Sequence, residues 1–434
     1  MQHKIGFISL GCAKNLVDSE QIMGLLRDSN FTFVNSPEEA DTIIINTCGF
    51  IDASKKESIQ TILEMSQYGK KLVVVGCLVE RYLKQLKKQL PEVDLFIPIH
   101  DYPRMDQLLN ELWNEDMIQS KFSYRHRMIT TPSYSAYLRI SEGCNNRCTY
   151  CAIPIIRGGF KSRPFDEIIS EAKTLEASGV KELVVISQDT TRYGTDLDDK
   201  TSITTLLKEL LKLKKIEYIR LLYLYPDEID DELLYLIRDN PRLTPYFDLP
   251  IQHASDHVLS EMHRRGNHDF LVDLIENRIR KIIPNAVIRT TIIVGFPGET
   301  EEDFDILMDF IQKMQFDHLG AFLYSREEGT VAYGMKNQVH YQTKKRRYEK
   351  LMQEQRKICY QKNKAWIGQE MEGLVISIDH DHHRYLLRSG WNAPDDIDGE
   401  IHFTAKKDLT LGDKVKIRIT ACYGYDLEGE YIEE

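Results

Sequence analysis

Short apolar runs alternate with helix-length segments in the first third of the chain. The apolar runs cover residues 4–10, 42–46 and 72–76, and polar residues are rare within them. The segment 18–27 between the first two runs is amphipathic, with apolar residues at helical spacing. Strands that are apolar on both faces are typical of parallel sheets covered by helices. We therefore predict an open parallel α/β sheet in an N-terminal domain, residues 1–120.

A polar segment and a second set of strands follow. Residues 121–135 are rich in Ser, Thr, Tyr and basic residues, which predicts a linker. Residues 136–365 contain six apolar strand candidates, each separated from the next by a helix-length segment. Repeated βα units predict a partial (β/α) barrel of the TIM type, with its chemistry at the carboxyl ends of the strands. The candidates are 137–140, 183–187, 219–223, 247–251, 287–294 and 318–324.

The pattern of apolar and polar residues changes again near Trp366. Residues 366–434 contain short β-rich runs at 372–379, 385–388, 400–404 and 414–420. This pattern predicts a small antiparallel β-barrel as the third domain. A length of 434 residues agrees with about three domains.

Composition and charge narrow the class of protein. With 42% hydrophobic and 28% charged residues, the chain has the composition of a globular protein. Its net charge of -11 argues against a surface devoted to nucleic acid, and no run reaches the roughly 18 apolar residues of a membrane span. We expect a cytoplasmic protein with no membrane partner. Residues 367–434 carry fifteen acidic and seven basic side chains, which favours a basic protein partner over an RNA.

Three cysteines form a local motif directly after the first barrel strand. Cys144, Cys148 and Cys151 have the spacing Cys-x3-Cys-x2-Cys. Three thiolates so close can each bind one iron of a four-iron cubane, which leaves the fourth iron open to the amino and carboxylate groups of S-adenosylmethionine. The alternative is a structural zinc site, which usually closes with a fourth Cys or His that does not follow here.

Three other cysteines lie at successive strand ends of the first domain. Cys12, Cys48 and Cys77 each follow a predicted strand within about two residues. The carboxyl edge of an open α/β sheet is where such folds build their sites, so we expect the three thiols to lie together. The alternative is three buried structural cysteines, because free Cys is among the most buried residue types.

The cysteine motif at 144–151 resembles that of the radical S-adenosylmethionine superfamily. With the N-terminal trio, essentially the whole chain resembles the methylthiotransferase family, including a C-terminal TRAM-type barrel. This resemblance implies two 4Fe-4S clusters, the second on Cys12, Cys48 and Cys77, and S-adenosylmethionine as a cofactor. It also implies transfer of a methylthio group to an unactivated carbon.

Two segments are similar to the RimO-type branch, which modifies the β-carbon of an aspartate in ribosomal protein S12. They are Ser-Leu-Gly-Cys-Ala-Lys-Asn-Leu-Val-Asp-Ser-Glu at 9–20 and Ala-Pro-Asp-Asp-Ile-Asp-Gly at 393–399. We interpret Asp395, Asp396 and Asp398 in the second segment as substrate-binding residues. The resemblance assigns no catalytic side chain.

The resemblance also implies partners. These are ribosomal protein S12, free or in the small subunit, a low-potential electron donor such as flavodoxin, and a sulfur donor; we expect no direct nucleic-acid substrate. Two alternatives stay open: a methylthiotransferase acting on isopentenyladenosine of transfer RNA, and an RNA-binding or ribosome-assembly factor whose clusters are structural.

Polar and glycine residues near the barrel strand ends are candidates for the S-adenosylmethionine site. The turn after strand 287–294 has glycines that allow close backbone approach, and it opens a helix whose first amides are free. The alternative is a set of structural groups with satisfied hydrogen bonds. The candidates are Gln188, Asp189, Gln252, His253, Arg289, Gly295, Gly298 and Glu299.

Overall fold

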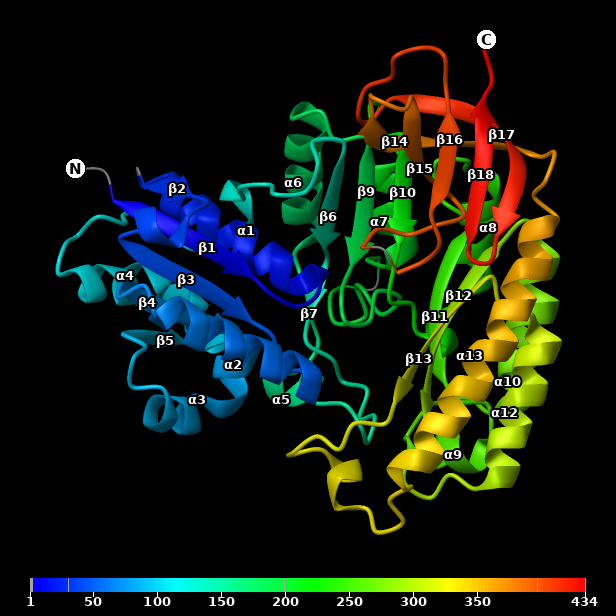
Figure 1. The fold of residues 1–434 in the computed structure, drawn as a ribbon, viewed down its shortest axis with the longest axis horizontal. Coiled ribbons are helices and arrows are strands. Elements are labelled where there is room, and N and C mark those ends of the chain that lie inside the picture. The colour runs from blue at the N-terminus through cyan, green and yellow to red at the C-terminus, as the bar shows by residue number, and fades with distance from the viewer. Residues whose placement is uncertain (1–2, 30, 199, 396, 434) are drawn as a thin grey trace.

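A computed structural model describes residues 3–29, 31–198, 200–395 and 397–433. It contains three packed units that follow one another along the chain, coloured from blue through green to red in Figure 1. No helix in these ranges is long and apolar enough to cross a membrane.

The first unit is a five-stranded parallel sheet of order β2-β1-β3-β4-β5 with helices on both faces. Alternate residues of β3 and β4 enter different cores: Ile44 and Val73 pack with α1 and α4, and Ile45 and Val74 pack with α2 and α3. This explains why these strands are apolar throughout. The elements are β1 Lys4–Ser9, α1 Ala13–Arg27, β2 Thr32–Val34, β3 Thr42–Thr47, α2 Asp52–Ser66, β4 Lys71–Gly76, α3 Cys77–Gln89, β5 Leu95–Ile97 and α4 Met105–Trp113.

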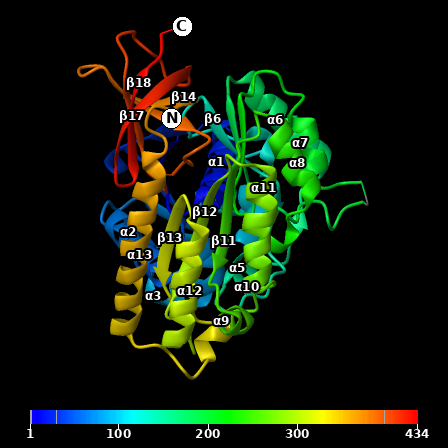
Figure 2. The same cartoon turned by 90° about the vertical axis from the view of Figure 1, so that its right-hand side faces the viewer.

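The second unit is a partial barrel, as the repeated βα pattern predicts. Its six strands form two parallel sheets, β6-β9-β10 and β11-β12-β13, joined where the Leu224 amide donates to the Asp248 carbonyl over 2.9 Å. The strands and main helices are β6 Ser135–Arg139, β7 Ser141–Glu142, α5 Ile153–Arg157, β8 Lys161–Ser162, α6 Phe165–Ala177, β9 Glu182–Ile186, α7 Ile203–Leu210, β10 Tyr218–Leu221, α8 Asp231–Asp239, β11 Tyr246–Gln252, α9 Asp256–Glu261, α10 His268–Val272, α11 Arg280–Ile282, β12 Val287–Val294, α12 Glu301–Met314, β13 His318–Leu323 and α13 Tyr341–Lys364. In Figure 2, α12 and α13 lie over β12 and β13.

The third unit is a closed five-stranded barrel of order β14-β15-β16-β18-β17. Its strands are β14 Glu370–Asp379, β15 Arg384–Ser389, β16 Ile401–Thr404, β17 Lys414–Tyr423 and β18 Asp426–Tyr431. Four of these match predicted runs, and β18 is an addition. It pairs antiparallel with β17 and parallel with β16, which closes a barrel whose other pairings are antiparallel.

The inner face of the partial barrel packs against both neighbouring units. Tyr137, Val184 and Tyr246 share one apolar cluster with Ala13 and Val17 of α1 and with the interior of the C-terminal barrel. The open side of the partial barrel is therefore covered by the other two units, and its carboxyl end faces the edge of the N-terminal sheet.

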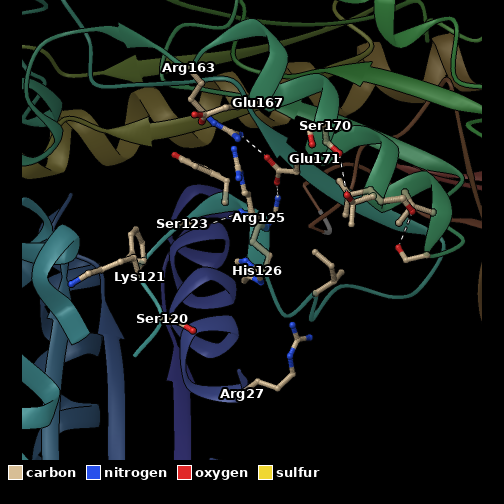
Figure 3. Close-up of a pocket in the computed structure, with 18 of the residues that line it drawn as sticks. Arg27, Ser120, Lys121, Ser123, Arg125, His126, Arg163, Glu167, Ser170 and Glu171 are labelled. Carbon is tan, nitrogen blue, oxygen red and sulfur yellow. Dashed lines mark hydrogen bonds and ion pairs between the residues drawn. The ribbon is translucent and has the colours of Figure 1, made fainter. Parts of the chain in front are cut away.

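The predicted linker is packed against its neighbours. The Met128 amide donates to the Glu20 carbonyl, and the buried Arg127 guanidinium donates to the Tyr137 carbonyl. Between this segment and α6 lies a groove of about 1220 Å³, where Arg125 and His126 of the linker lie opposite Ser170 and Glu171 (Figure 3). No cysteine is among the residues that line this groove.

A substitution at Gly24 of α1 tests whether the linker 121–135 packs against this helix. A Cβ at Gly24 would lie 1.5 Å from the His126 carbonyl oxygen, so the helix and the linker touch backbone to backbone. Gly24→Ala should destabilise the protein by about 1–3 kcal/mol, because overpacking outweighs the gain in helix propensity. Urea unfolding measures the change, and trypsin should cut faster after Arg125.

Gly334→Ala is the matched control, because its Cβ would meet no atom within 4 Å. Equal stability and equal tryptic cleavage of the Gly24→Ala and Gly334→Ala proteins would contradict the packed linker.

Candidate functional site

The N-terminal cysteines lie at the carboxyl ends of three adjacent parallel strands. Cys12 follows β1, Cys48 follows β3 and Cys77 begins α3 directly after β4. Gly11 has a φ of +94°, and a Cβ there would lie 3.2 Å from the Cys48 Sγ, so the loop of Cys12 lies directly on Cys48. The structure thus places the three thiols at one edge of the sheet.

Cys77 is held between the N-terminal sheet and the barrel. Its Sγ donates to the Asn15 Oδ1 over 3.2 Å and accepts from the Arg157 Nη2 over 3.3 Å. Burial raises the pKa of the Cys77 thiol to about 12, and the Arg157 guanidinium opposes that rise. A thiolate at this position needs nearby positive charge, which the guanidinium supplies in part and bound iron would supply in full.

The barrel cysteines lie on the loop between β7 and α5. Backbone amides two residues further along approach two of the sulfurs, from Asn146 to Cys144 over 3.4 Å and from Ile153 to Cys151 over 3.5 Å. Burial raises the pKa of the Cys151 thiol to about 12. The backbone of this loop therefore curves around the Cys144 and Cys151 sulfurs, as expected for cysteines so close in sequence.

Cys148 faces the barrel instead. The Tyr225 hydroxyl lies 3.6 Å from the Cys148 Sγ, and the Arg264 Nη1 lies 3.9 Å from it. The Arg264 guanidinium lies 4.0 Å from the centre of the Tyr225 ring. Cationic and hydroxyl groups around the sulfur favour an anionic ligand set.

The two cysteine trios lie next to each other across the domain interface. Cys77 packs in one apolar cluster with Ala152 and Ile156, and Ala152 directly follows Cys151. Arg157, in the same short helix α5, reaches Cys77 from the barrel side. The side chains of one segment, 151–157, therefore contact both sites.

The donor chemistry of the two trios suits iron-sulfur clusters. Each trio supplies three thiol groups, and three thiolates can bind three irons of a cubane and leave the fourth iron free of protein ligands. Across the described ranges, no three His, Cys, Asp or Glu side chains form a site for a single metal ion.

Asp189 supports the cysteine loop. Its carboxylate accepts from the Asn146 side-chain amide over 2.6 Å and from the Thr191 hydroxyl over 3.1 Å. Desolvation raises the pKa of this fully buried carboxyl. Gln188 donates to Glu142 over 3.2 Å, and its own Oε1 has no partner among the described residues.

Gln252 and His253 lie where β11 ends. Gln252 has a φ of +72°, a left-handed backbone that is unusual for a residue with a side chain and is often found at functional sites. The Ser255 amide donates to the His253 Nδ1 over 3.0 Å, so the neutral ring carries its proton on Nε2. That Nε2 is fully buried and has no hydrogen-bond partner among the described residues.

The glycine turn after β12 is shaped by Glu299. The Glu299 carboxylate accepts from the Gly295 amide over 2.7 Å and from the Phe296 amide over 3.2 Å, and it pairs with Arg347 of α13 over 2.7 Å. The Glu299 carboxylate thus stabilises the turn from inside. Gly298 has a φ of +87° and open space where a Cβ would be, and its amide donates to the Asn337 carbonyl over 2.8 Å.

Arg289 and Asp398 lie where the barrel meets the C-terminal unit. Arg289 donates to Asp248 over 2.9 Å and lies 3.4 Å from Asp398, whose side chain is 1% exposed. Asp398 also accepts from the Tyr246 hydroxyl over 2.6 Å. In this structure its carboxylate contacts groups of the chain itself.

Asp395 is exposed, has a φ of +70° and accepts from the Tyr137 hydroxyl, and Asp396 lies outside the described residues.

Several site residues carry no sequence signal of their own. Asn15 and Lys14 fall within the motif around Cys12, but nothing in their spacing shows that they face the barrel. Arg157, Tyr225 and Arg264 contact cysteines that lie up to 116 positions away in the chain. Only the folded chain brings them together.

His253 makes the stability of the protein depend on pH. Burial lowers the pKa of this imidazole to about 3, against 6.5 in the unfolded chain. Below pH 6.5 the unfolded state binds a proton that the folded state excludes, so stability falls as the pH falls. Between pH 7.5 and 5.5 the free energy of unfolding should drop by about 1.4 kcal/mol from this residue.

Urea unfolding of the wild type and of His253→Gln at the two pH values measures that drop, which the substitution should remove. His380→Gln, at an exposed position, is the control and should retain it. An equal drop in the wild type and in His253→Gln would show that the folded protein protonates His253.

Comparisons with known proteins agree with the three units. Residues 4–98 match the model of Uncharacterized protein family UPF0004, residues 138–311 match the Radical SAM superfamily, and residues 367–432 match the TRAM domain. Membership of the radical SAM superfamily implies a 4Fe-4S cluster and S-adenosylmethionine as cofactors.

Solved structures share the fold. TsrM, a radical S-adenosylmethionine methyltransferase from Kitasatospora setae, superposes with a TM-score of 0.55 at 13% identity, over 74% of this chain and 75% of its own. The cobalamin-dependent radical enzyme OxsB superposes with a TM-score of 0.51 at 10% identity, over 82% of this chain and 56% of its own. These likenesses concern the fold alone.

Curated relatives match over the full length. The "Ribosomal protein uS12 methylthiotransferase RimO" of Acetivibrio thermocellus is 44% identical over 100% of this chain and 99% of its own length. The protein of the same name from Aquifex aeolicus is 45% identical over 99% of this chain and 98% of its own. With the three domain matches and the two adjacent cysteine trios, these identities show that the chain belongs to the RimO-type family of radical S-adenosylmethionine methylthiotransferases.

Proposed function

We propose that this enzyme transfers a methylthio group to the β-carbon of an aspartate in ribosomal protein uS12. The observation that carries the proposal is the packing of the two cysteine trios across one interface, where Cys77 contacts Ala152 and accepts a hydrogen bond from Arg157. A reaction that joins sulfur to a carbon radical needs its sulfur source beside its radical source. The names of the full-length relatives supply the substrate.

Each trio has a separate task in this proposal. Cys144, Cys148 and Cys151 would hold the 4Fe-4S cluster that binds S-adenosylmethionine, and Cys12, Cys48 and Cys77 would hold a second 4Fe-4S cluster. The barrel cluster would supply the electron for cleavage of S-adenosylmethionine to a carbon radical, and the second cluster would supply a place for the sulfur, whose methyl group would come from another S-adenosylmethionine.

The residues of the chain position these groups and exclude water. Asp189 fixes the cysteine loop through Asn146. The open space at Gly298 lets a cofactor approach this turn, although the Gly298 amide already donates to the Asn337 carbonyl. The buried His253 Nε2 lies 3.8 Å from the Glu299 carboxylate and supports the turn from inside. We include Gln188, Gln252, Arg289, Gly295 and Glu299 in the same site, as its inner lining or support. A buried site protects a reactive radical from side reactions.

The Glu327 carboxylate of the barrel forms a second set of contacts with the N-terminal unit. Glu327, in the loop after β13, accepts from the Lys55 Nζ over 2.9 Å, from the Arg81 Nη1 over 3.0 Å and from the Asp52 amide over 2.9 Å. All three donors belong to the N-terminal unit, close to Cys48 and Cys77. The barrel and the N-terminal unit are thus tied at two places, through Glu327 and through the ion pairs of Asp18.

The charge of the C-terminal barrel favours a protein substrate over transfer RNA. The basic residues of β17 are paired with acidic residues of β14: Arg418 with Glu370 over 3.0 Å and Lys414 with Glu372 over 2.9 Å. These exposed basic side chains are paired with carboxylates on the barrel surface, which leaves less net positive charge to bind phosphates. Asp395, which is exposed and bonded to the Tyr137 hydroxyl of the partial barrel, is our candidate contact for the basic substrate.

The reaction requires further partners. We propose a low-potential electron donor such as flavodoxin, a sulfur donor, and uS12 either free or in the small ribosomal subunit, all in the cytoplasm.

Iron content tests the two-cluster assignment. Anaerobic reconstitution should load about eight irons per chain, following four irons per cubane. Replacing either trio by Ala should halve that number. Colorimetric iron analysis and electron paramagnetic resonance measure the content and type of cluster.

Cys359 and Cys422 belong to neither trio, so the double variant Cys359→Ala/Cys422→Ala is the control and should keep full iron content. If the Cys12/Cys48/Cys77 triple variant kept the full iron content, the assignment of a second cluster to these cysteines would be wrong.

Mass spectrometry tests the substrate. Reconstituted enzyme with reductant, sulfide and S-adenosylmethionine should add a methylthio group to one aspartate of purified uS12. Transfer RNA bearing isopentenyladenosine should remain unmodified in the parallel reaction. Modification of the transfer RNA with uS12 left unchanged would replace the proposed function with its alternative.

A further inference from the structure

Lys14 is a buried cation that lies between the N-terminal unit and the barrel. It occupies the first turn of α1, two residues after Cys12, and is 8% exposed. Its Nζ lies 2.8 Å from the centre of the Tyr223 ring, and the described residues offer it no hydrogen bond or ion pair. A buried charge without a polar partner is costly, so an anion that reached Lys14 from outside the chain would be stabilised there.

Three arginines of this region already hold carboxylates of the chain. Arg139 pairs with Asp18 over 2.6 Å, and Arg157 pairs with the same carboxylate over 2.7 Å. Arg289 is likewise occupied by Asp248. Lys14 differs from these three arginines because its charge is free to accept an anion from outside.

Tyr223, on which Lys14 lies, is held in a strained conformation. Its φ is +62°, which is costly for an aromatic residue. The Tyr223 amide donates to the Asp248 carboxylate over 2.9 Å, and its carbonyl accepts from the Thr190 amide over 3.1 Å. The surrounding structure therefore fixes the ring beneath the ammonium group.

The position of Lys14 links the two cysteine sites. Asn15, the next residue, accepts a hydrogen bond from Cys77. On the barrel side, Tyr223 is bonded to Thr190, and the neighbouring Asp189 holds Asn146 of the cysteine loop. Lys14 therefore lies between residues that contact the two cysteine sites.

We infer that the Lys14 ammonium binds the side-chain carboxylate of the substrate aspartate and so selects an acidic residue for modification. The inference rests on the proposed function. The carboxylate carbon of an aspartate is bonded to its β-carbon, so a cation that fixes the carboxylate also fixes the reacting carbon. An aspartate that leaves water needs such a partner, because an unpaired buried carboxylate is strongly disfavoured.

The test compares two peptides that span the target site of uS12, one with Asp at the modified position and one with Asn. Binding to the reconstituted enzyme with S-adenosylmethionine, but without reductant, is measured by calorimetry so that no turnover occurs. The wild type should bind the Asp peptide at least about ten-fold more tightly, the size expected for a hydrogen bond between charged groups. Equal affinities would overturn the inference without any variant.

Variants assign that preference to Lys14. Lys14→Met removes the charge at similar length and should bind the two peptides equally, whereas Lys14→Arg should retain a preference for Asp. Lys56→Met removes an exposed lysine of the neighbouring helix α2 and should keep the wild-type ratio. The inference would be overturned if Lys14→Met, with full iron content, still preferred the Asp peptide as strongly as the wild type does. It would also be overturned if the substitution changed only the midpoint potential of a cluster.

Two further outcomes distinguish a failure of the Lys14 assignment from a failure of the proposed function. If Lys14→Met fails to load iron, the inference is judged from the wild type and from Lys14→Arg, by the ratio of their affinities for the Asp and Asn peptides. Loss of the preference for Asp in a Lys14→Arg protein with full iron content would count against the inference. Turnover of uS12 by the wild type tests the proposed function on its own: an enzyme that modifies uS12 but binds both peptides equally fails only the Lys14 assignment. An enzyme that leaves uS12 unmodified fails the proposed function.

Discussion

The buried ion pairs between α1 and the barrel set the geometry of the whole molecule. Asp18 of α1 binds Arg139 over 2.6 Å and Arg157 over 2.7 Å, and Glu142 binds Arg157 over 3.0 Å. Burying such charges is expensive, and the attraction offsets that cost only when the groups meet in one arrangement. These pairs therefore fix how the N-terminal sheet docks on the barrel. The proximity of the two cysteine trios follows from that docking.

The same helix explains where the sequence was informative and where it was not. The amphipathic pattern of 18–27 predicts a helix at α1, which is confirmed, but periodicity alone does not reveal that its polar residues are buried too. Asn15, Ser19 and Glu20 are all at most 1% exposed because the sheet, the linker and the barrel surround them. Burial of a polar side chain depends on partners distant in sequence, so no local pattern encodes it.

The fold class was predictable, and the details that failed have physical reasons. The parallel strands are apolar because both their faces are covered, so hydrophobicity identified them. β18 was missed because Asp426–Tyr431 is mostly polar, with a single large aliphatic residue, Leu427, to fill the barrel core. The segment 121–135 has the composition of a linker, yet Arg127 is 9% exposed because Glu20 and Glu171 neutralise its charge. The cysteine motif at 144–151 is local and could be recognised, whereas contacts such as Arg157 with Cys77 could not.

The segment after β15, described at 390–395 and 397–399, connects the C-terminal barrel to the partial barrel. Trp391 accepts a hydrogen bond from the His318 ring over 2.7 Å, and the Asp398 carboxylate lies under Arg289 and Tyr246. This barrel thus bonds directly to the strands of the partial barrel. As a consequence, the domain is not an interchangeable module: a chimaera that carries the corresponding barrel of another family member would have mismatched contacts unless strands β11, β12 and β13 were exchanged with it.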